Sequence, residues 1–192
     1  MQGLNQLKVT SPTSSVTSLI LFESKASGLC PILVTVAYLA LSYLFMVLVN
    51  LGDENLITDP AYDSYASQVV VADDVPIHCV LSVSDQDRTT SDFRFGIGQL
   101  RAKCSNSAKA IVSNNPKSNG LIVVADEAYE WLVWNKQMIR FASHSGLNER
   151  TVSIGSPGKA FSVNGWRFGW CIAQKHLMTP MRIMHQNCFH VQ

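Results

Sequence analysis

The feature of this sequence that most constrains its fold is a set of apolar segments that each adjoin a polar turn. Residues 121–125 (LIVVA) stop at Asp126, residues 150–154 stop at a turn containing Gly and Pro, and residues 168–173 form a third such segment. Continuous apolar segments are typical of strands that helices cover on both faces, as in parallel sheets. We therefore expect an α/β fold in which a mostly parallel sheet is flanked by helices.

Further candidate strands and helices alternate along the rest of the chain. Strands are expected at 32–36, 55–58, 76–83 and 108–112. Helices are expected at 39–49, from 62 to 70, in the segment that ends with 99–103, and from 176 to 184. Residues 114–120 contain Asn, Pro and Gly and predict a turn.

The composition places the chain among globular proteins and excludes some partners. Its 192 residues are 47% hydrophobic and 15% charged, which is enough for one domain with a sizeable core. The net charge is +1 and the basic residues form no run, so we expect no nucleic acid partner. The 5 cysteines are widely spaced without a C-x-x-C motif, which favours reduced thiols and a cytoplasmic location, with a mitochondrial one as the alternative.

One segment competes for a membrane interpretation. Residues 31–49 carry no charge, and about 18 such residues can span a bilayer. However, no cluster of Lys or Arg flanks the segment, and the acidic pair Asp53 and Glu54 follows closely. A buried strand that leads into a buried helix explains the same residues. We favour that interpretation and keep a membrane-anchored protein as the weaker alternative.

Chemically distinctive residues follow two of the apolar strands. Asp126 and Tyr129 follow the first strand, and Ser156, Lys159 and Arg167 follow the second. Parallel sheets place ligand sites at the carboxyl ends of their strands, so we expect these residues to share one site. A lysine amine can form a Schiff base, a carboxylate can keep a pyridine nitrogen protonated, and serine and arginine suit a phosphate. This set predicts a site for pyridoxal 5′-phosphate.

Two competing motifs do not hold. The S-x-x-K pattern at 156–159 also occurs in serine β-lactamases, but those need S-D-N and K-T-G partners that this sequence lacks. A metal site would need ligand pairs at zinc spacing, which are also missing, so we expect none. The residues that raised this second alternative are His185, Cys188 and His190.

Several longer motifs carry a resemblance to a known family. They are 126–133 (DEAYEWLV), 149–162 (ERTVSIGSPGKAFS), 165–170 (GWRFGW) with 185–187 (HQN), and 52–54 (GDE) with 59–65 (DPAYDSY). From about residue 31 onward the chain resembles the fold-type I aminotransferases of class I/II. Within that class it is most similar to the kynurenine aminotransferase group, also called glutamine transaminase K or cysteine-S-conjugate β-lyase.

The resemblance implies a role for each site residue. It implies that Lys159 is catalytic and carries pyridoxal 5′-phosphate, that Asp126 pairs with the ring nitrogen, and that Tyr129 bonds the ring oxygen. It implies that Tyr62 stacks on the ring. Ala37 and Tyr38 would lie at the phosphate, together with Ser156 and Arg167. The ring-contacting asparagine of the family falls on Asn119 here, or on Ser118 in the other register.

The resemblance also implies an activity and an assembly. The reaction would exchange an amino group between an amino acid, kynurenine-like or glutamine-like, and a 2-oxo acid. β-Elimination from cysteine conjugates is a related activity of the group, and its members are homodimers.

Departures from the family pattern define the expected domain organisation. Residues 1–29 form a polar extension without a counterpart, and residues 30–192 correspond to a partial large domain without the C-terminal small domain. A family glycine is replaced by Ala37, and a helix is missing near 120/121. Only the 8 residues 113–120 then connect two strands that should be parallel, although such crossovers usually need a dozen residues or more. We therefore expect a displaced strand or a locally rebuilt sheet, and a catalytically inactive fragment is the alternative function.

Overall fold

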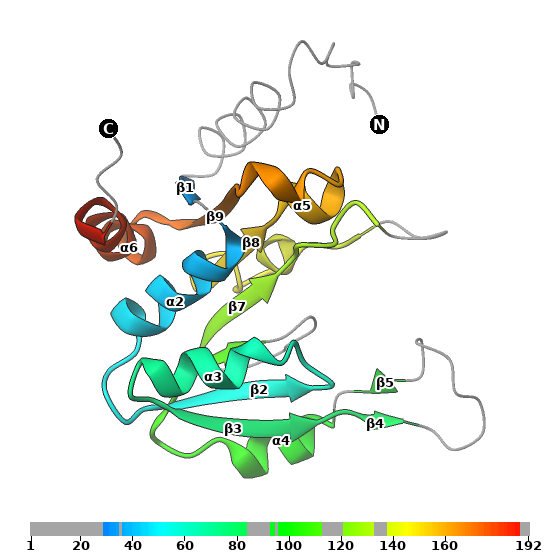
Figure 1. The fold of residues 1–192 in the computed structure, drawn as a ribbon. Helices are drawn as coiled ribbons and strands as arrows, with labels where there is room; N and C mark the ends of the chain where they lie inside the picture. The colour runs from blue at the N-terminus through cyan, green and yellow to red at the C-terminus, as the bar shows by residue number, and fades with distance from the viewer. Residues whose placement is uncertain are drawn as a thin grey trace.

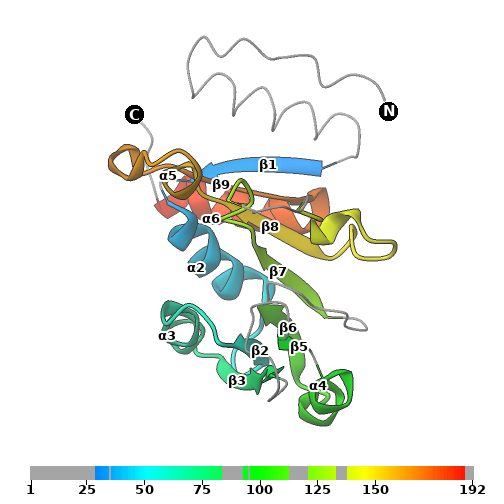
Figure 2. The same cartoon turned by 90° about the vertical axis from the view of Figure 1, so that its right-hand side faces the viewer.

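A seven-stranded sheet forms the centre of the computed structural model, which describes residues 29–34, 36–83, 93–94, 96–112, 121–132 and 138–188. Its strands, in spatial order, are β1 (Leu29–Val34), β9 (Gly169–Gln174), β8 (Thr151–Gly155), β7 (Ile122–Asp126), β6 (Ala108–Val112), β2 (Glu54–Asp59) and β3 (Val75–Val80). Neighbours are parallel except around β9, which is antiparallel to both β1 and β8. The predicted mostly parallel α/β sheet is confirmed, and Figure 2 shows the sheet from β1 to β3.

Helices cover both faces of this sheet. On one face lie α2 (Ala37–Leu48), α3 (Ser64–Val71) and α6 (Lys175–Cys188), and on the other lie α4 (Ile97–Lys103) and η2 (Phe141–Ser143). In Figure 1, α2 and α3 lie along the same side of the strands, and α4 lies behind β3. Two shorter helices, α5 (Pro157–Ala160) and η3 (Asn164–Trp166), join β8 to β9, and a small second sheet pairs β4 (Ser82–Val83) with β5 (Phe93–Arg94).

Side chains of the central strands alternate between two cores. In β7, Val124 packs in the core beneath α2, α3 and α6, whereas Val123 and Ala125 pack in the core beneath α4 and η2. All three side chains are fully buried. Because helices cover both faces, neither set of strand side chains needs to be polar, and this explains the continuous apolar segments in the sequence.

The uncharged segment 31–49 is divided between two elements. Its first part belongs to β1, whose residues pair with β9, and its second part forms α2. With 12 residues, α2 is about 18 Å long, which is shorter than the ~30 Å hydrocarbon core of a bilayer. Across the described ranges, no helix has both the length and the apolar character that crossing a membrane requires.

The expectation of a displaced strand near residue 120 is wrong. Strands β6 and β7 are parallel neighbours, and only residues 110–112 pair with 122–124. Because the overlap is short, the chain needs to return only about 7 Å along the strand direction, which is two residues at ~3.3 Å each. Eight extended residues reach more than twice that distance, so no crossover helix is required.

The expected extension cannot be compared with the structure, because residues 1–28 lie outside the described residues. Leu29, the last residue assigned to that extension, is the first residue of β1. The predicted turn at 114–120 also lies outside them.

Candidate active site

Strand pairing brings the predicted site segments to one edge of the sheet. Asp126 and Gly155 are the last residues of the neighbouring strands β7 and β8. At the start of β9, Trp170 pairs with Gly155 and Gly169 pairs with Val34, the last residue of β1. Because β9 runs opposite to its neighbours, the segments after β1, β7 and β8 and the segment before β9 all meet at this edge.

Two donors hold the carboxylate of Asp126. The Tyr65 hydroxyl donates to Oδ2 of Asp126 at 2.6 Å, and the backbone N–H of Ala128 donates to Oδ1 at 3.1 Å. Tyr65 lies on α3, far from β7 in the sequence, and its side chain is only 7% exposed. Asp126 is therefore fixed through both oxygens at the end of its strand.

Tyr62 lies next to this pair and remains accessible. Its ring meets the ring of Tyr65 edge-on, with centroids 5.6 Å apart and an interplanar angle of 80°. Tyr62 is 55% exposed, so its own ring still presents free surface. Tyr62, which is predicted to stack on the cofactor, is thus linked to Asp126 through the side chain of Tyr65.

Lys159 faces the turn that follows Asp126. It lies in α5, and its Nζ is 5.9 Å from the centre of the Tyr129 ring, a cation–π distance. A second contact joins the same two segments, because the rings of Trp131 and Phe161 are 6.4 Å apart. The structure therefore places the Lys159 amine beside the Tyr129 ring, in the turn that follows Asp126.

The amino end of α2 lies against the start of β9. Helix α2 begins at Ala37 and Tyr38, and its N-cap residue Val36 makes no side-chain capping hydrogen bond. A Cβ added to Gly169 would lie 2.5 Å from the backbone nitrogen of Ala37, so only glycine permits this approach. The amide groups of a helix amino end favour an anion, and they lie near the residues that flank β8 and β9 here.

Ser156 and Arg167 complete this part of the edge. Ser156 follows β8 directly, as the N-cap of α5. Arg167, two residues before Gly169, is exposed and has a φ of 48°, an uncommon backbone conformation for a residue with a long side chain. Such conformations are frequent at functional sites.

Two predicted positions cannot be placed, and one site residue was missed. Asn119 and its alternative Ser118 lie outside the described residues. Tyr65 was missed, although it is the last residue of the motif at 59–65. The motif contained Tyr65, but Asp126, the hydrogen-bond partner of Tyr65, is 61 residues away, and no local pattern links the two residues.

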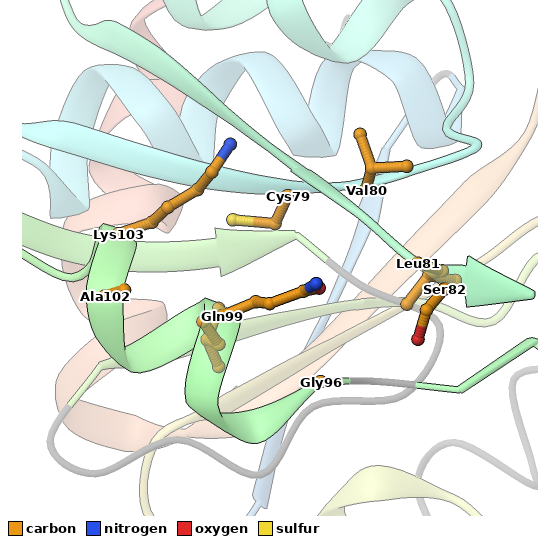
Figure 3. Close-up of a pocket in the computed structure, with 9 residues that line it drawn as sticks. Cys79, Val80, Leu81, Ser82, Gly96, Gln99, Ala102 and Lys103 are labelled. Atoms are coloured by element: carbon orange, nitrogen blue, oxygen red, sulfur yellow. The ribbon is translucent and has the colours of Figure 1, made fainter.

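A hollow of about 400 Å³ lies elsewhere, between β3 and α4. Figure 3 shows Cys79 and Val80 of β3 on one side and Gln99 and Lys103 of α4 on the other. No predicted site residue lines it. Burial raises the pKa of the Cys79 thiol, with the nearby Lys103 charge opposing the shift. Its lining residues include the amine of Lys103 but no carboxylate and no aromatic ring, so the sheet edge is the better candidate for catalysis.

The residues near the carboxyl end of α6 have ordinary contacts. The His185 ring lies 5.7 Å from the Tyr43 ring, and Cys188 Sγ contacts Met184 Sδ at 3.8 Å. Within the described part of the chain, no group of three potential metal ligands occurs. His190 lies outside that part.

Comparisons with known proteins identify the family of this chain. The aminotransferase class I and II profile matches residues 109–190. Kynurenine–oxoglutarate transaminase 3 of Mus musculus is 35% identical over 167 residues, covering 74% of this chain and 37% of that protein. The chain belongs to the class I and II aminotransferase family. The predicted resemblance to this family is thereby confirmed.

Further members of the aminotransferase family extend the match. Kynurenine–oxoglutarate transaminase 1 of Rattus norvegicus is 32% identical over 197 residues, covering 88% of this chain and 47% of that protein. The structure of N-succinyldiaminopimelate aminotransferase from Mycobacterium tuberculosis matches with a TM-score of 0.77 at 23% identity, covering 92% of this chain and 52% of that one. The chain thus has the fold of that structure and spans less than half the length of these two curated relatives.

Proposed function

We propose that this chain binds pyridoxal 5′-phosphate at the sheet edge and takes part in transamination. The reaction would exchange an amino group between a kynurenine-like or glutamine-like amino acid and a 2-oxo acid, in a homodimer. The observation that carries the proposal is the approach of the Lys159 amine to the Tyr129 ring, in the turn that follows Asp126. The transaminase names of the relatives support the substrate class.

The residues present fit this cofactor. The open amino end of α2, Ser156 and Arg167 offer amide, hydroxyl and guanidinium donors for the phosphate. The glycine at 169 keeps that helix end close to β9. Asp126 offers a carboxylate to the ring nitrogen, and the exposed Tyr62 ring offers a stacking surface.

Each of these residues then has a defined task. Bound pyridoxal phosphate supplies an electron sink for the substrate α-carbon. Lys159 would supply the amine that holds the cofactor, and the same amine could carry a proton to and from that carbon. Asp126 would keep the ring nitrogen protonated, and Tyr129 would offer a hydroxyl to the ring oxygen. The phosphate donors anchor the cofactor throughout.

The proposal is tested by attaching the cofactor to the full 192-residue chain. The protein is incubated with pyridoxal phosphate, reduced with borohydride and digested, and its peptides are analysed by mass spectrometry. We expect a visible absorption band that survives dialysis, and one reduced cofactor on the peptide that contains Lys159. Lys159→Ala should lose both signals, whereas Lys175→Ala, which removes an exposed lysine of α6, should keep both.

Amino-group transfer is then assayed with kynurenine or glutamine as donor and a 2-oxo acid as acceptor. Cofactor attachment together with transfer supports the full proposal. Attachment without transfer supports the alternative of a catalytically inactive family member. If the wild-type chain takes up no cofactor, or takes it up equally well as Lys159→Ala, the proposal is overturned.

A further inference from the structure

We propose that Tyr65 is a positioning residue that fixes Asp126 and Tyr62 relative to each other, in the arrangement that the cofactor ring requires. The inference rests on the proposed function, and it assigns a role to a residue that would itself touch neither cofactor nor substrate. It is carried by two contacts that Tyr65 makes with two different site residues.

The first contact fixes the carboxylate. The Tyr65 hydroxyl reaches Oδ2 of Asp126 at 2.6 Å, while the backbone of Ala128 occupies Oδ1. Without the hydroxyl, Asp126 would keep one bond from its own turn and could rotate about its side-chain bonds. With the hydroxyl, the plane of the carboxylate is set from two sides.

The second contact fixes the ring-facing aromatic. The rings of Tyr62 and Tyr65 meet edge to face, with centroids 5.6 Å apart and an interplanar angle of 80°. This geometry is the favoured edge-to-face arrangement of aromatic pairs. Tyr65 therefore touches both Asp126, which is predicted to pair with the ring nitrogen, and Tyr62, which is predicted to stack on the ring.

Tyr65 itself is held by the protein core. It is 7% exposed and belongs to the apolar cluster that includes Val69 of α3 and Ile57 of β2. Burial raises the pKa of its phenol strongly, and the neighbouring Asp126 charge raises that pKa further. The hydroxyl therefore stays protonated and remains a donor at physiological pH.

The central test is Tyr65→Phe in the full chain, because phenylalanine keeps the ring contact with Tyr62 and removes only the hydroxyl. We expect pyridoxal phosphate to bind about tenfold more weakly, because a hydrogen bond to a charged group is lost. We also expect the absorption maximum of the bound cofactor to shift, because the carboxylate no longer faces the ring nitrogen in one orientation. Titrations at about 10 °C, where small domains are near maximal stability, keep a weakened variant folded.

A matched control removes a hydroxyl from a different buried tyrosine. Tyr43, on α2, is 4% exposed and packs near α6, away from Asp126. Tyr43→Phe is expected to leave cofactor affinity and the absorption maximum unchanged, whatever it does to the Tm. A purely structural role for Tyr65 predicts that both Phe variants behave alike.

A double variant shows whether Tyr65 acts through Asp126. In an Asp126→Asn background, Tyr65→Phe should weaken cofactor binding less than twofold further. Equal affinity and equal absorption in wild type and Tyr65→Phe would overturn the inference and leave the proposed function standing. Failure of the wild-type chain to bind the cofactor would instead overturn the proposed function, and the inference with it.

Discussion

At the scale of single residues, the site depends on places where a side chain would not fit. Gly155 and Gly169 stand at the end of β8 and the start of β9. A Cβ on Gly155 would lie 2.2 Å from the Trp170 ring, and one on Gly169 would lie 2.5 Å from the backbone of Ala37. The first obstacle is a buried side chain, but the second is backbone, which yields less easily. Gly169 therefore sets how close α2 comes to the sheet edge.

Gly169→Ala is expected to lower the free energy of unfolding by about 1–3 kcal/mol, a usual cost of overpacking. It should also weaken pyridoxal phosphate binding, because the amino end of α2 must move. Denaturant titration measures the first effect and cofactor titration the second. Gly98→Ala is the control, because a Cβ there meets nothing within 4 Å in an exposed turn of α4. It should raise stability by about 0.5–1 kcal/mol, and equal losses from both substitutions would contradict the argument.

The sequence allows a residue to be predicted as part of the site where its functional group is chemically distinctive. Lys159, Tyr129 and Asp126 carry an unusual combination of groups, and the structure places the Lys159 amine beside the Tyr129 ring in the turn after Asp126. Tyr65 has no such signature, because its hydroxyl acts on a residue 61 positions away. The close packing of Gly169 on Ala37 likewise depends on which strands become neighbours. A contact made only by the tertiary fold leaves no pattern in a local sequence window.

At the scale of elements, the strand at 108–112 was predicted with both ends correct, because polar residues bound its apolar core. The strand predicted at 168–173 was also found, within one residue, as β9. Its antiparallel direction was not predicted, because an apolar segment has the same composition in either direction. The link through α5 and η3 returns the chain to the same edge of the sheet at which β8 ends, so β9 runs in the opposite direction.

The turn between α3 and β3 contains a buried acid with an incomplete set of hydrogen bonds. Asn55 of β2 donates its amide to Oδ2 of Asp74 at 3.1 Å. Oδ1 of Asp74 and Oδ1 of Asn55 are both buried without a partner among the described residues. Burial raises the pKa of Asp74, the Asn55 hydrogen bond opposes this, and Asp53 and Asp73 add to it. The folded protein therefore holds the proton of Asp74 more tightly than the unfolded chain does.

Asp74→Asn is expected to raise the free energy of unfolding by about 1 kcal/mol at pH 7, because its amide can donate to Asn55 Oδ1 while its oxygen still accepts. In the wild type, protonated Asp74 contributes to the free energy of unfolding. This contribution is fully present below the pKa of Asp74 in the unfolded chain, near 3.8, and is lost as pH rises through its higher pKa in the folded protein. The advantage of the variant should therefore disappear at low pH. Urea unfolding at several pH values measures it.

Asp73→Asn, at the exposed neighbouring position, serves as the control and should change stability by less than half as much at pH 7. An advantage of Asp74→Asn that is the same at all pH values would contradict the explanation by titration of Asp74.

At the scale of the whole molecule, α2 connects most of the structure. It packs against α3, α6 and several strands, and its buried residues belong to the larger of the two cores. Leu44 is fully buried at the centre of that core, whereas Met46 on the same helix is 44% exposed. Loss of contacts at Leu44 should therefore affect all elements together.

Leu44→Ala is expected to cost about 2–5 kcal/mol of stability, the usual range for a large cavity in a core. Far-ultraviolet circular dichroism and tryptophan fluorescence should report the same lowered midpoint, because one core joins these elements. Met46→Ala should cost less than about 1 kcal/mol. Separate midpoints from the two probes would show that the helices and the strand edge unfold independently.

The reversed direction of β9 has a consequence for how this protein can vary. Residues 156–168 leave the sheet at the end of β8 and re-enter it beside the same point, so an insertion or deletion there need not move either strand. The same change would alter the reach between the amine at 159 and the guanidinium at 167. We therefore expect a change in the length of this excursion to affect the proposed binding of pyridoxal phosphate more than the stability of the sheet.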